Sequence, residues 1–304
     1  MAAVDNEAAC TLVSSHGIMK SCDVFPENPH SDSKKVYSYN WGCLQDGHTV
    51  YIQADAISDF VKNVLPQIRV RFILVTGDGD QTIPKDVLSK KRFQKFIKDH
   101  RLLHWYSQNL NIQHPKMTGI PIGLDYHTLA KAGHKVWGHT LSSRDQEQML
   151  FQILASSPPL SQRKLLCHAN FHFNMNAGYA RKDRPEAMLL VPKELVYYQP
   201  KPLSRKETWE AQAQLAFVLS PHGNGYDCHR TWEALALGCV PIVKSSPIDF
   251  LFQGLPVLIV QSWAHVTQQL LTQTLDNFLN HPFAPDPYNM HKLTLQHWMR
   301  VIKS

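Results

Sequence analysis

Short apolar runs alternate with amphipathic segments along this 304-residue chain, and no other feature restricts its fold as strongly. The apolar runs have the length of β-strands, and the segments between them have the spacing of helices with one apolar face. In the first half we expect strands at 50–53, 70–76, 102–106 and 118–124 and helices at 56–65, 85–100 and 146–155. Strands that alternate with helices form parallel sheets covered by helices, so this half is expected to be an α/β unit.

A second alternation begins at Lys164, after a Ser/Pro-rich segment that is typical of a linker. Its expected strands are 165–167, 195–198, 216–220, 240–243 and 257–260, and its expected helices are 181–190, 204–213, 228–237 and 263–280. Ser204 and Glu207 have the spacing of a capping box, which supports one of these helices. The sequence therefore predicts an N-terminal domain over 1–157, a C-terminal domain over 158–285, and a closing helix in 286–304 that packs back on the first domain.

The charge and composition of the chain narrow its partners. Hydrophobic residues make up 43% and charged residues 18%, which is typical of a globular protein. The net charge of +6 is mild, and the longest basic stretch, 90–98, has apolar residues at helical spacing between its lysines. Such a stretch is typical of an amphipathic helix rather than of a nucleic-acid-binding stripe. We expect no nucleic-acid partner, and the positive charge suits an enzyme with a diphosphate substrate.

Neither the cysteines nor the histidines are spaced like metal ligands. The six cysteines contain no CxxC pair, and the 17 histidines contain no HExxH. His168 and His172 follow an apolar run that is typical of a strand, which does not favour a zinc site. The N-terminus lacks a basic stretch followed by an apolar run, and no 18 consecutive residues are apolar. We therefore expect no metal, no disulfide framework, no integral membrane segment, and a soluble, cytoplasmic protein.

The segment from Phe217 to Val243 has the composition of a phosphate site. A strand enters a loop with Gly223 and Gly225, where glycine lets backbone amides approach an anion, and the loop leads into the N-terminus of a helix. Arg230 near the first turn carries a guanidinium that matches two phosphate oxygens. The other loop residues that we expect to contact the phosphate-bearing ligand are Ser220, His222, Asn224 and Tyr226.

Glu233 follows Arg230 by three residues and lies on the same face of the expected helix. A carboxylate in this position accepts hydrogen bonds from both hydroxyls of a ribose, as acidic residues do in dinucleotide-binding folds. The order of strand, glycine loop, arginine and glutamate therefore predicts a site for a nucleoside diphosphate. The structural alternative is an ordinary strand-to-helix turn with Asp227 as the helix cap.

The string from Arg230 to Val243, Arg-Thr-Trp-Glu-Ala-Leu-Ala-Leu-Gly-Cys-Val-Pro-Ile-Val, resembles the signature of exostosin-like glycosyltransferases. Further segments that resemble this family are 72–80, 105–110 with 121–125, and 170–176 with Arg181. The family has the GT-B architecture, in which two Rossmann-like domains with parallel sheets face each other across a cleft. Its members bind a nucleoside-diphosphate sugar mainly through the second domain and use no bound metal. The short chain is most similar to compact microbial and algal-virus members, among them a xylosyltransferase.

The resemblance implies how the diphosphate is held. Arg181 matches a family arginine that supports Arg230, and Lys182 and Arg184 compete for this role. Two arginines and a helix N-terminus would replace a divalent cation at the leaving group.

Asp78 and Asp80 follow the strongest expected strand, at the edge of the sheet where open α/β folds bind ligands. Relatives carry an acid at the last position of this loop, so Asp80 is the predicted general base and Asp78 its reserve. The resemblance also implies attack from the face opposite the leaving group, which inverts the anomeric carbon. The residues expected on the acceptor side are Asn109, Asp125, Tyr126 and His127.

Together these features predict an inverting, metal-independent glycosyltransferase without a cofactor. It would move a sugar, with xylose suggested by the resemblance, from a UDP-sugar to a hydroxyl of a glycan or glycoprotein. Asp78-Gly-Asp80 is also a DxD sequence, which binds Mn²⁺ or Mg²⁺ in single-domain GT-A enzymes, so a metal-dependent transferase is one alternative. The others are a nucleotide- or sugar-binding module without catalysis and an RNA-binding protein.

Overall fold

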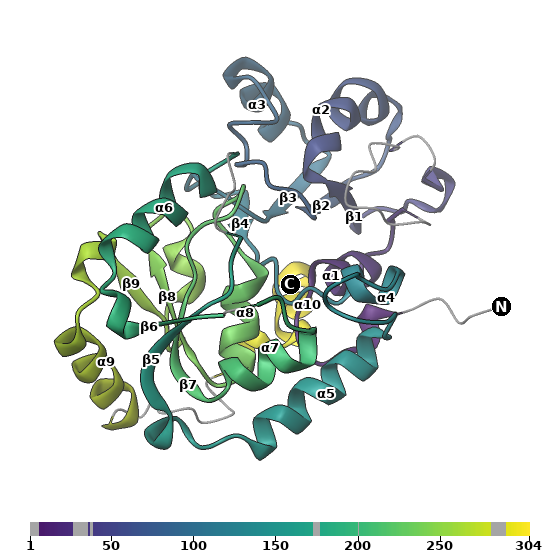
Figure 1. The fold of residues 1–304 in the computed structure, drawn as a ribbon. Coiled ribbons are helices and arrows are strands. Elements are labelled where there is room, and N and C mark those ends of the chain that lie inside the picture. The colour runs from purple at the N-terminus through teal and green to yellow at the C-terminus, as the bar shows by residue number, and fades with distance from the viewer. Residues whose placement is uncertain (1–5, 27–35, 37–38, 173–176, 200, 281–289) are drawn as a thin grey trace.

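Two parallel β-sheets, one in each half of the chain, form the centres of two lobes (Figure 1). The computed structural model describes residues 6–26, 36, 39–172, 177–199, 201–280 and 290–304. Of the segment 170–176 that resembles the exostosin-like family, residues 173–176 lie outside the described residues. No helix in the described part of the chain is both long and apolar enough to span a membrane.

The first sheet has parallel strands in the order β1-β2-β3-β4. Their bounds are His48–Gln53 for β1, Phe72–Gly77 for β2, Leu102–Ser107 for β3 and Met117–Gly119 for β4. Short helical turns from Ala54 to Gln67, including α2 (Ile57–Asp59), connect β1 to β2, and α3 (Lys90–Ile97) connects β2 to β3. The helix predicted at 85–100 was too long, because α3 starts only after Ser89, whose hydroxyl accepts a hydrogen bond from Arg92 N at 3.4 Å.

The second sheet has parallel strands in the order β6-β5-β7-β8-β9. The strands are β5 (Lys164–Ala169), β6 (Val196–Tyr198), β7 (Leu215–Leu219), β8 (Val240–Lys244) and β9 (Leu258–Val260). The helices of this half are α6 (Ala180–Leu190), α7 (Arg205–Gln212), α8 (His229–Ala236) and α9 (Gln268–Asn280). The predicted capping box of α7 is confirmed, since Ser204 Oγ accepts from Glu207 N and the Glu207 carboxylate accepts from Ser204 N.

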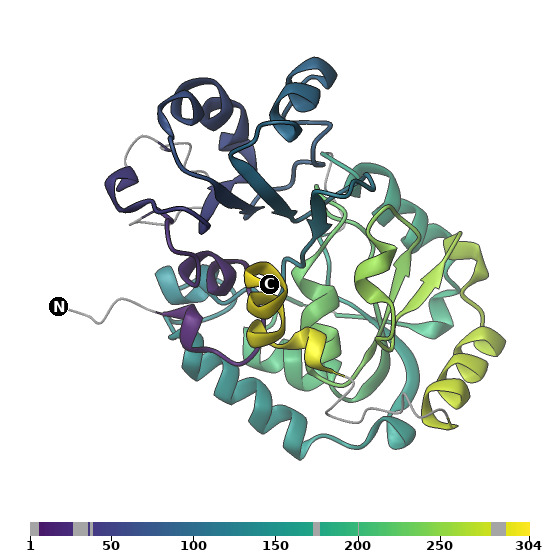
Figure 2. The ribbon, with the colours of Figure 1, turned by 180° about the vertical axis from the view of Figure 1, so that it is seen from behind.

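Helices from both ends of the chain, α1 (Ser15–Lys20) and α10 (Leu295–Lys303), lie side by side between the two lobes (Figure 2). Val13 N donates to Leu293 O at 2.8 Å, and the Tyr106 hydroxyl donates to Val301 O at 2.7 Å. The C-terminal helix therefore contacts elements of the first half. The domain boundaries at 157 and 285 stay predictions.

The two halves also share a buried core. One apolar cluster contains Tyr51 and Val75 from the first sheet together with Trp209 of α7 and Trp232 of α8. The remaining helices of the first half are α4 (His127–Lys131) and α5 (Ser143–Ser156), and α5 packs against α7. Because side chains from both halves interdigitate, the loops at the edges of the two sheets are held close together.

Candidate functional site

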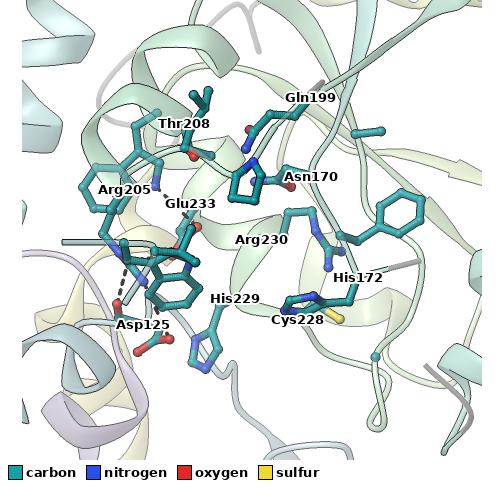
Figure 3. A pocket seen from close by; sticks show the side chains of 18 of the residues that line it. Asp125, Asn170, His172, Gln199, Arg205, Thr208, Cys228, His229, Arg230 and Glu233 are labelled. Atoms are coloured by element: carbon teal, nitrogen blue, oxygen red, sulfur yellow. Dashed lines mark hydrogen bonds and ion pairs between the residues drawn. The ribbon is translucent and has the colours of Figure 1, made fainter. Parts of the chain in front are cut away.

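A cavity of about 620 Å³ lies between the two halves of the chain (Figure 3). The segments that follow β5, β6 and β7 form much of its wall, together with α7 and the first turns of α8. The first half contributes Asp80, Ile122, Asp125 and Trp137. Parallel sheets bind ligands at the carboxyl ends of their strands, so this is the expected place for a substrate. The predicted fold class, α/β of the GT-B type with two parallel-sheet units around a cleft, is confirmed by this arrangement.

Arg230 lies in the first turn of α8 and forms part of the cavity wall. Its Nη1 donates to Ser220 Oγ at 3.3 Å and to Pro221 O at 3.2 Å, so the loop before α8 holds the guanidinium. Cys228, the N-cap residue of α8, makes no side-chain capping bond. The predicted donor residues Gly223 and Asn224 line the cavity beside this helix end. A helix N-terminus and a held guanidinium together favour an anion.

Arg184 of α6 places a second guanidinium on the same wall. Its Nε donates to His222 O at 3.2 Å and its Nη1 to His172 O at 2.8 Å. The guanidinium carbons of Arg184 and Arg230 lie 5.8 and 5.4 Å from the centre of the Phe171 ring. Burial, and then the charge of Arg230, lower the pKa of Arg184 to about 10. Two cations in one partly buried wall repel each other, and a bound diphosphate would relieve that repulsion.

Arg181, which the resemblance assigned to the donor, is exposed and does not line the cavity. The buried positions of α6 are Ala180, Asp183, Arg184 and Ala187. Residues at this spacing share the inner face of a helix, and Arg181 falls on the outer face. The structure therefore corrects the choice among the arginines, because Arg184 reaches the cavity and Arg181 does not.

Glu233 of α8 lines the cavity, as expected for a ribose contact. Its Oε1 accepts from Arg205 Nη1 at 3.1 Å, and its Oε2 accepts from Trp209 Nε1 at 3.4 Å. A carboxylate has about four lone-pair sites, so each oxygen keeps capacity for a further donor. The two protein contacts fix the orientation of the carboxylate at the cavity wall.

Arg205, the first residue of α7, ties this wall to the first half of the chain. The guanidinium lies over the Trp137 ring at 4.4 Å and over the Trp209 ring at 5.0 Å, and the side chain is only 5% exposed. Its Nη1 donates to Asp125 O at 2.7 Å, and its Nη2 lies 3.7 Å from the Asp125 carboxylate. One buried cation therefore contacts Glu233 on the donor side and Asp125 on the predicted acceptor side.

Two of the predicted acceptor residues, Asp125 and His127, lie at the same end of the cavity. Asp125 lines the wall, whereas His127 lies behind it with its ring centre 5.8 Å from that of His229. Burial raises the pKa of Asp125, but the charges of His229, His127 and Arg205 outweigh it and hold the pKa well below its usual range. Burial lowers the pKa of His127 to about 4, so this ring is neutral at neutral pH.

The other two predicted acceptor residues, Tyr126 and Asn109, are buried and do not line the cavity. The Tyr126 hydroxyl donates to Glu147 Oε1 at 3.4 Å. Asn109 Oδ1 accepts from Asp227 N at 2.9 Å, and its Nδ2 donates to Gly79 O at 3.2 Å. Asn109 thus joins the two halves of the chain, and neither residue is placed to contact an acceptor in the cavity.

The structure separates the two predicted catalytic aspartates. Asp80 is exposed at the cavity wall, where its Oδ2 accepts from Asn224 Nδ2 at 3.2 Å across the two halves. Asp78 is buried outside the cavity lining, and its Oδ2 lies 3.0 Å from Gln53 Nε2 and 3.1 Å from His16 Nε2. Burial raises the pKa of Asp78, but the hydrogen bond and charge of His16 outweigh it and hold the pKa below its usual range. Asp78 is therefore not placed to take a proton in the cavity.

Several predicted donor residues support the wall without lining it. His222 Nδ1 lies 3.2 Å from the Asp183 carboxylate, and the Tyr226 ring stacks on Tyr179 with centroids 3.9 Å apart. Gly225 approaches the first half so closely that an added Cβ would lie 2.6 Å from the nearest side-chain atom. These residues fix the conformation of the loop before α8. The surface of the cavity itself is formed by other residues of the loop, among them Gly223 and Asn224.

Asp227 is a buried contact between the halves and not the helix cap that the structural alternative required. Its Oδ2 accepts from Ile122 N at 2.7 Å, and its Oδ1 accepts from Trp232 Nε1 at 2.8 Å and from Cys228 N at 3.0 Å. Burial outweighs these bonds and raises the pKa of Asp227 to about 6. The N-cap of α8 is Cys228.

One group in the described part of the chain has the residue types of a metal site: Glu7, His16 and His127, with ligand atoms within 4.8 Å of one another. The two imidazole rings are stacked, with centroids 4.2 Å apart and planes at 23°, so their in-plane lone pairs run side by side and do not converge on one ion. His16 also contacts Asp78 at 3.1 Å and Glu7 at 3.7 Å. These contacts explain why the three residues lie together: they belong to a buried ionic network that includes Asp78.

Sequence reasoning missed Phe171, Arg205 and His229, which all line the cavity. His229 stands next to Arg230 inside the phosphate motif, and that position was a usable signal. Arg205 gave no signal, because the composition of a polar helix does not show which of its charged residues is buried.

No family model and no curated protein sequence matches this chain. Its overall arrangement is similar to that of an α,α-trehalose-phosphate synthase (UDP-forming) from Burkholderia vietnamiensis, at 9% identity and a TM-score of 0.39 over 86% of this chain and 74% of that chain. An E. coli structure described as trehalose-6-phosphate bound with UDP-2-fluoro glucose gives 11% identity and a TM-score of 0.41 over 86% and 72%. An α1,3-fucosyltransferase gives 12% and 0.37 over 81% and 68%. These values identify neither a family nor an activity, so membership of the exostosin-like family stays a prediction.

Proposed function

We propose that the chain is a glycosyltransferase that moves a sugar from a nucleoside-diphosphate sugar to a hydroxyl group. The observation that supports this most is the pair of guanidinium groups of Arg184 and Arg230, which share one cavity wall around Phe171. Donors fixed in this way stabilise the charge that develops on a departing diphosphate. Glu233, held by Arg205 on the same wall, would accept the ribose hydroxyls.

The finer proposals come from the resemblance to exostosin-like enzymes. UDP is the proposed nucleotide, xylose the proposed sugar, and a glycan or glycoprotein hydroxyl the proposed acceptor. The proposed reaction inverts the anomeric carbon and needs no metal or other cofactor, because two guanidinium groups and a helix end act at the leaving group. The sequence proposes Asp80, which lines the cavity and accepts a hydrogen bond from Asn224, as the proton acceptor.

The metal-dependent alternative is less well supported. A DxD site needs both carboxylates at the diphosphate, and Asp78 is buried outside the cavity lining with Gln53 and His16 on one of its oxygens. A binding module without catalysis would share the proposed nucleotide site, so the two are separated by assaying release of UDP from a UDP-sugar.

Thermal unfolding with and without UDP tests the nucleotide site. At a UDP concentration 100 times its Kd, binding stabilises the folded protein by about 2.7 kcal/mol, which raises the Tm. Loss of a charged hydrogen bond costs about 1.5–3 kcal/mol, so Arg184→Ala and Arg230→Ala should each weaken UDP binding by roughly 10- to 100-fold. Arg181→Ala is the matched control on the outer face of α6 and should bind UDP like the wild type. No shift with UDP in the wild type, or a greater loss in Arg181→Ala than in Arg184→Ala, would contradict the proposal.

A further inference from the structure

His229, the first residue of α8, lines the cavity beside Arg230 and near Asp125 (Figure 3). Its Nδ1 lies 2.8 Å from Gly123 O. A carbonyl oxygen only accepts hydrogen bonds, so Nδ1 carries the proton and Nε2 carries the lone pair of the neutral ring. Within the described residues, Nε2 makes no hydrogen bond to the protein. The side chain therefore brings an unused proton-accepting nitrogen to the cavity wall.

The carbonyl that orients His229 is itself held in place. Gly123 has a φ of +67°, and a Cβ built there would lie 2.2 Å from Val13 O, so the segment fits only with glycine. The next residue, Leu124, donates its N–H to the same Val13 O at 2.8 Å. The imidazole is thus carried by the second half of the chain and oriented by the first, at the boundary between the proposed donor and acceptor sides.

The charges around His229 suit a group that gains a proton during the reaction. Asp125 is buried on the neighbouring wall, 3.7 Å from the guanidinium of Arg205, and its pKa lies well below its usual range although burial raises it, so the carboxylate is ionised. An ionised carboxylate nearby stabilises an imidazolium as it forms. Arg230 is next along the chain, and a bound diphosphate would neutralise its charge.

Asp80, the base proposed from the sequence, is less well positioned than His229 to accept a proton from the acceptor hydroxyl. It is exposed to water, and its Oδ2 already accepts a hydrogen bond from Asn224 Nδ2 at 3.2 Å. That bond links the two halves of the chain, which gives Asp80 a positioning role. Among the described residues of the first half, none makes a hydrogen bond to its carboxylate that would aim it, whereas the bond to Gly123 O aims the imidazole of His229.

We infer that His229 is the general base of the glycosyl transfer, an inference that rests on the proposed function. The acceptor O–H gives its proton to Nε2, and the oxygen lone pair forms the bond to the anomeric carbon. The bond from that carbon to the diphosphate oxygen breaks, and its electron pair leaves on UDP, where Arg184 and Arg230 stabilise it.

His229→Asn tests this inference with little change in structure. The Asn amide N–H reaches the position of Nδ1 and keeps the bond to Gly123 O, but the variant has no basic nitrogen. We expect UDP to raise the Tm as it does in the wild type. Release of UDP from UDP-xylose or UDP-glucose, with a panel of monosaccharide and disaccharide acceptors, should fall by roughly 10²–10⁴-fold. In His229→Ala, added imidazole should restore part of this rate. His265→Asn, at an exposed histidine outside the cavity lining, is the matched control and should keep the full rate.

The possible outcomes distinguish failure of the proposed glycosyltransferase function from failure of the assignment of His229 as the general base. A wild type that neither binds UDP nor releases it from either UDP-sugar overturns the proposed function and the base with it. A wild type that turns over, with His229→Asn equally active and Asp80→Asn inactive, overturns only the assignment of His229. Loss of UDP binding in parallel with loss of turnover in His229→Asn also overturns it, because that result indicates a structural role.

Discussion

The guanidinium of Arg205 connects two carboxylates that belong to different halves of the chain. It donates to Glu233 at 3.1 Å and lies 3.7 Å from the carboxylate of Asp125, in a side chain that is 5% exposed. Trp137 and Trp209 pack over the guanidinium and exclude water from it. A buried charge that loses its partner is costly, so the carboxylates depend on this residue.

Arg205→Met is therefore expected to lower the free energy of unfolding by about 3–5 kcal/mol, because it leaves the buried carboxylate of Asp125 and the partly buried carboxylate of Glu233 without their cation. Urea denaturation measures this change. Lys206→Met, at the next position of α7, is the control: Lys206 lies 3.8 Å from Glu210 with side chains 63% and 51% exposed. An exposed pair of this kind is worth about 0.2–1 kcal/mol. Equal losses in the two variants would show that Arg205 does not hold the carboxylates.

Asp78 and Asp80 show that a local sequence motif can locate residues on a strand end without distinguishing their roles. The sequence placed both at the carboxyl end of a strand, and β2 does end at Gly77, directly before them. It could not separate them, because Asp78 has a φ of +51° and its partner His16 lies 62 residues earlier in the chain. Backbone conformation and distant partners decided which carboxylate faces the cavity.

At the scale of elements, the segment from β7 through its glycine loop to α8 was the best predicted part of the site. Its strand, loop and helix are contiguous, so local patterns were sufficient. The prediction for α6 was correct in type and extent, but it preferred Arg181, which lies on the exposed face, over the competing Arg184. The buried stripe of Ala180, Asp183, Arg184 and Ala187 has helical spacing in the sequence, and it selects Arg184. The resemblance favoured Arg181 because a sequence motif compares positions along the chain and carries no information on which way a side chain points.

The turn before α6 packs tightly against the glycine loop, which leads to a prediction about Gly178. Ala180 N donates to Gly223 O at 2.7 Å, and a Cβ on Gly178 would lie 2.4 Å from the Cα of Asn224. Gly178→Ala should therefore displace the loop that holds the proposed diphosphate. At a φ of +54°, alanine adopts an unfavourable backbone conformation, which has a cost of its own. The collision of the new Cβ with the backbone of Asn224 should lower the free energy of unfolding by a further amount of about 1–3 kcal/mol.

Gly254→Ala is the control for this prediction, because Gly254 has a φ of +80° and no atom of the described residues lies within 4 Å of an added Cβ. It should cost about 1 kcal/mol of stability and leave the Kd for UDP unchanged. Gly178→Ala should raise that Kd, as measured by calorimetry. The same Kd in both alanine variants would mean that the turn before α6 does not support the nucleotide site.

At the scale of the whole molecule, the halves meet through contacts that no local pattern encodes. The Thr82 hydroxyl and the Tyr179 hydroxyl lie 2.8 Å apart, and Asp227 accepts from Ile122 N at 2.7 Å. The sequence could predict two parallel-sheet units and a cleft, since each unit follows from its own alternation. It misassigned Asn109 to the acceptor, because its bond to Asp227 spans 118 residues and depends on how the two units dock.

The charge of the assembled cavity leads to a prediction about metals. Its donor wall carries the guanidinium groups of Arg184 and Arg230, which repel a divalent cation and supply the charge that one would bring. On the facing loop, Asp78 is engaged with His16 and Gln53, so Asp78-Gly-Asp80 does not offer a pair of carboxylates to the cavity. EDTA should therefore leave both the UDP-dependent rise in Tm and the rate of UDP release unchanged, and added Mn²⁺ should not increase either. A rate lost in EDTA and restored by Mn²⁺ would require an ion to reach the diphosphate past these two cations, and would favour the DxD mechanism.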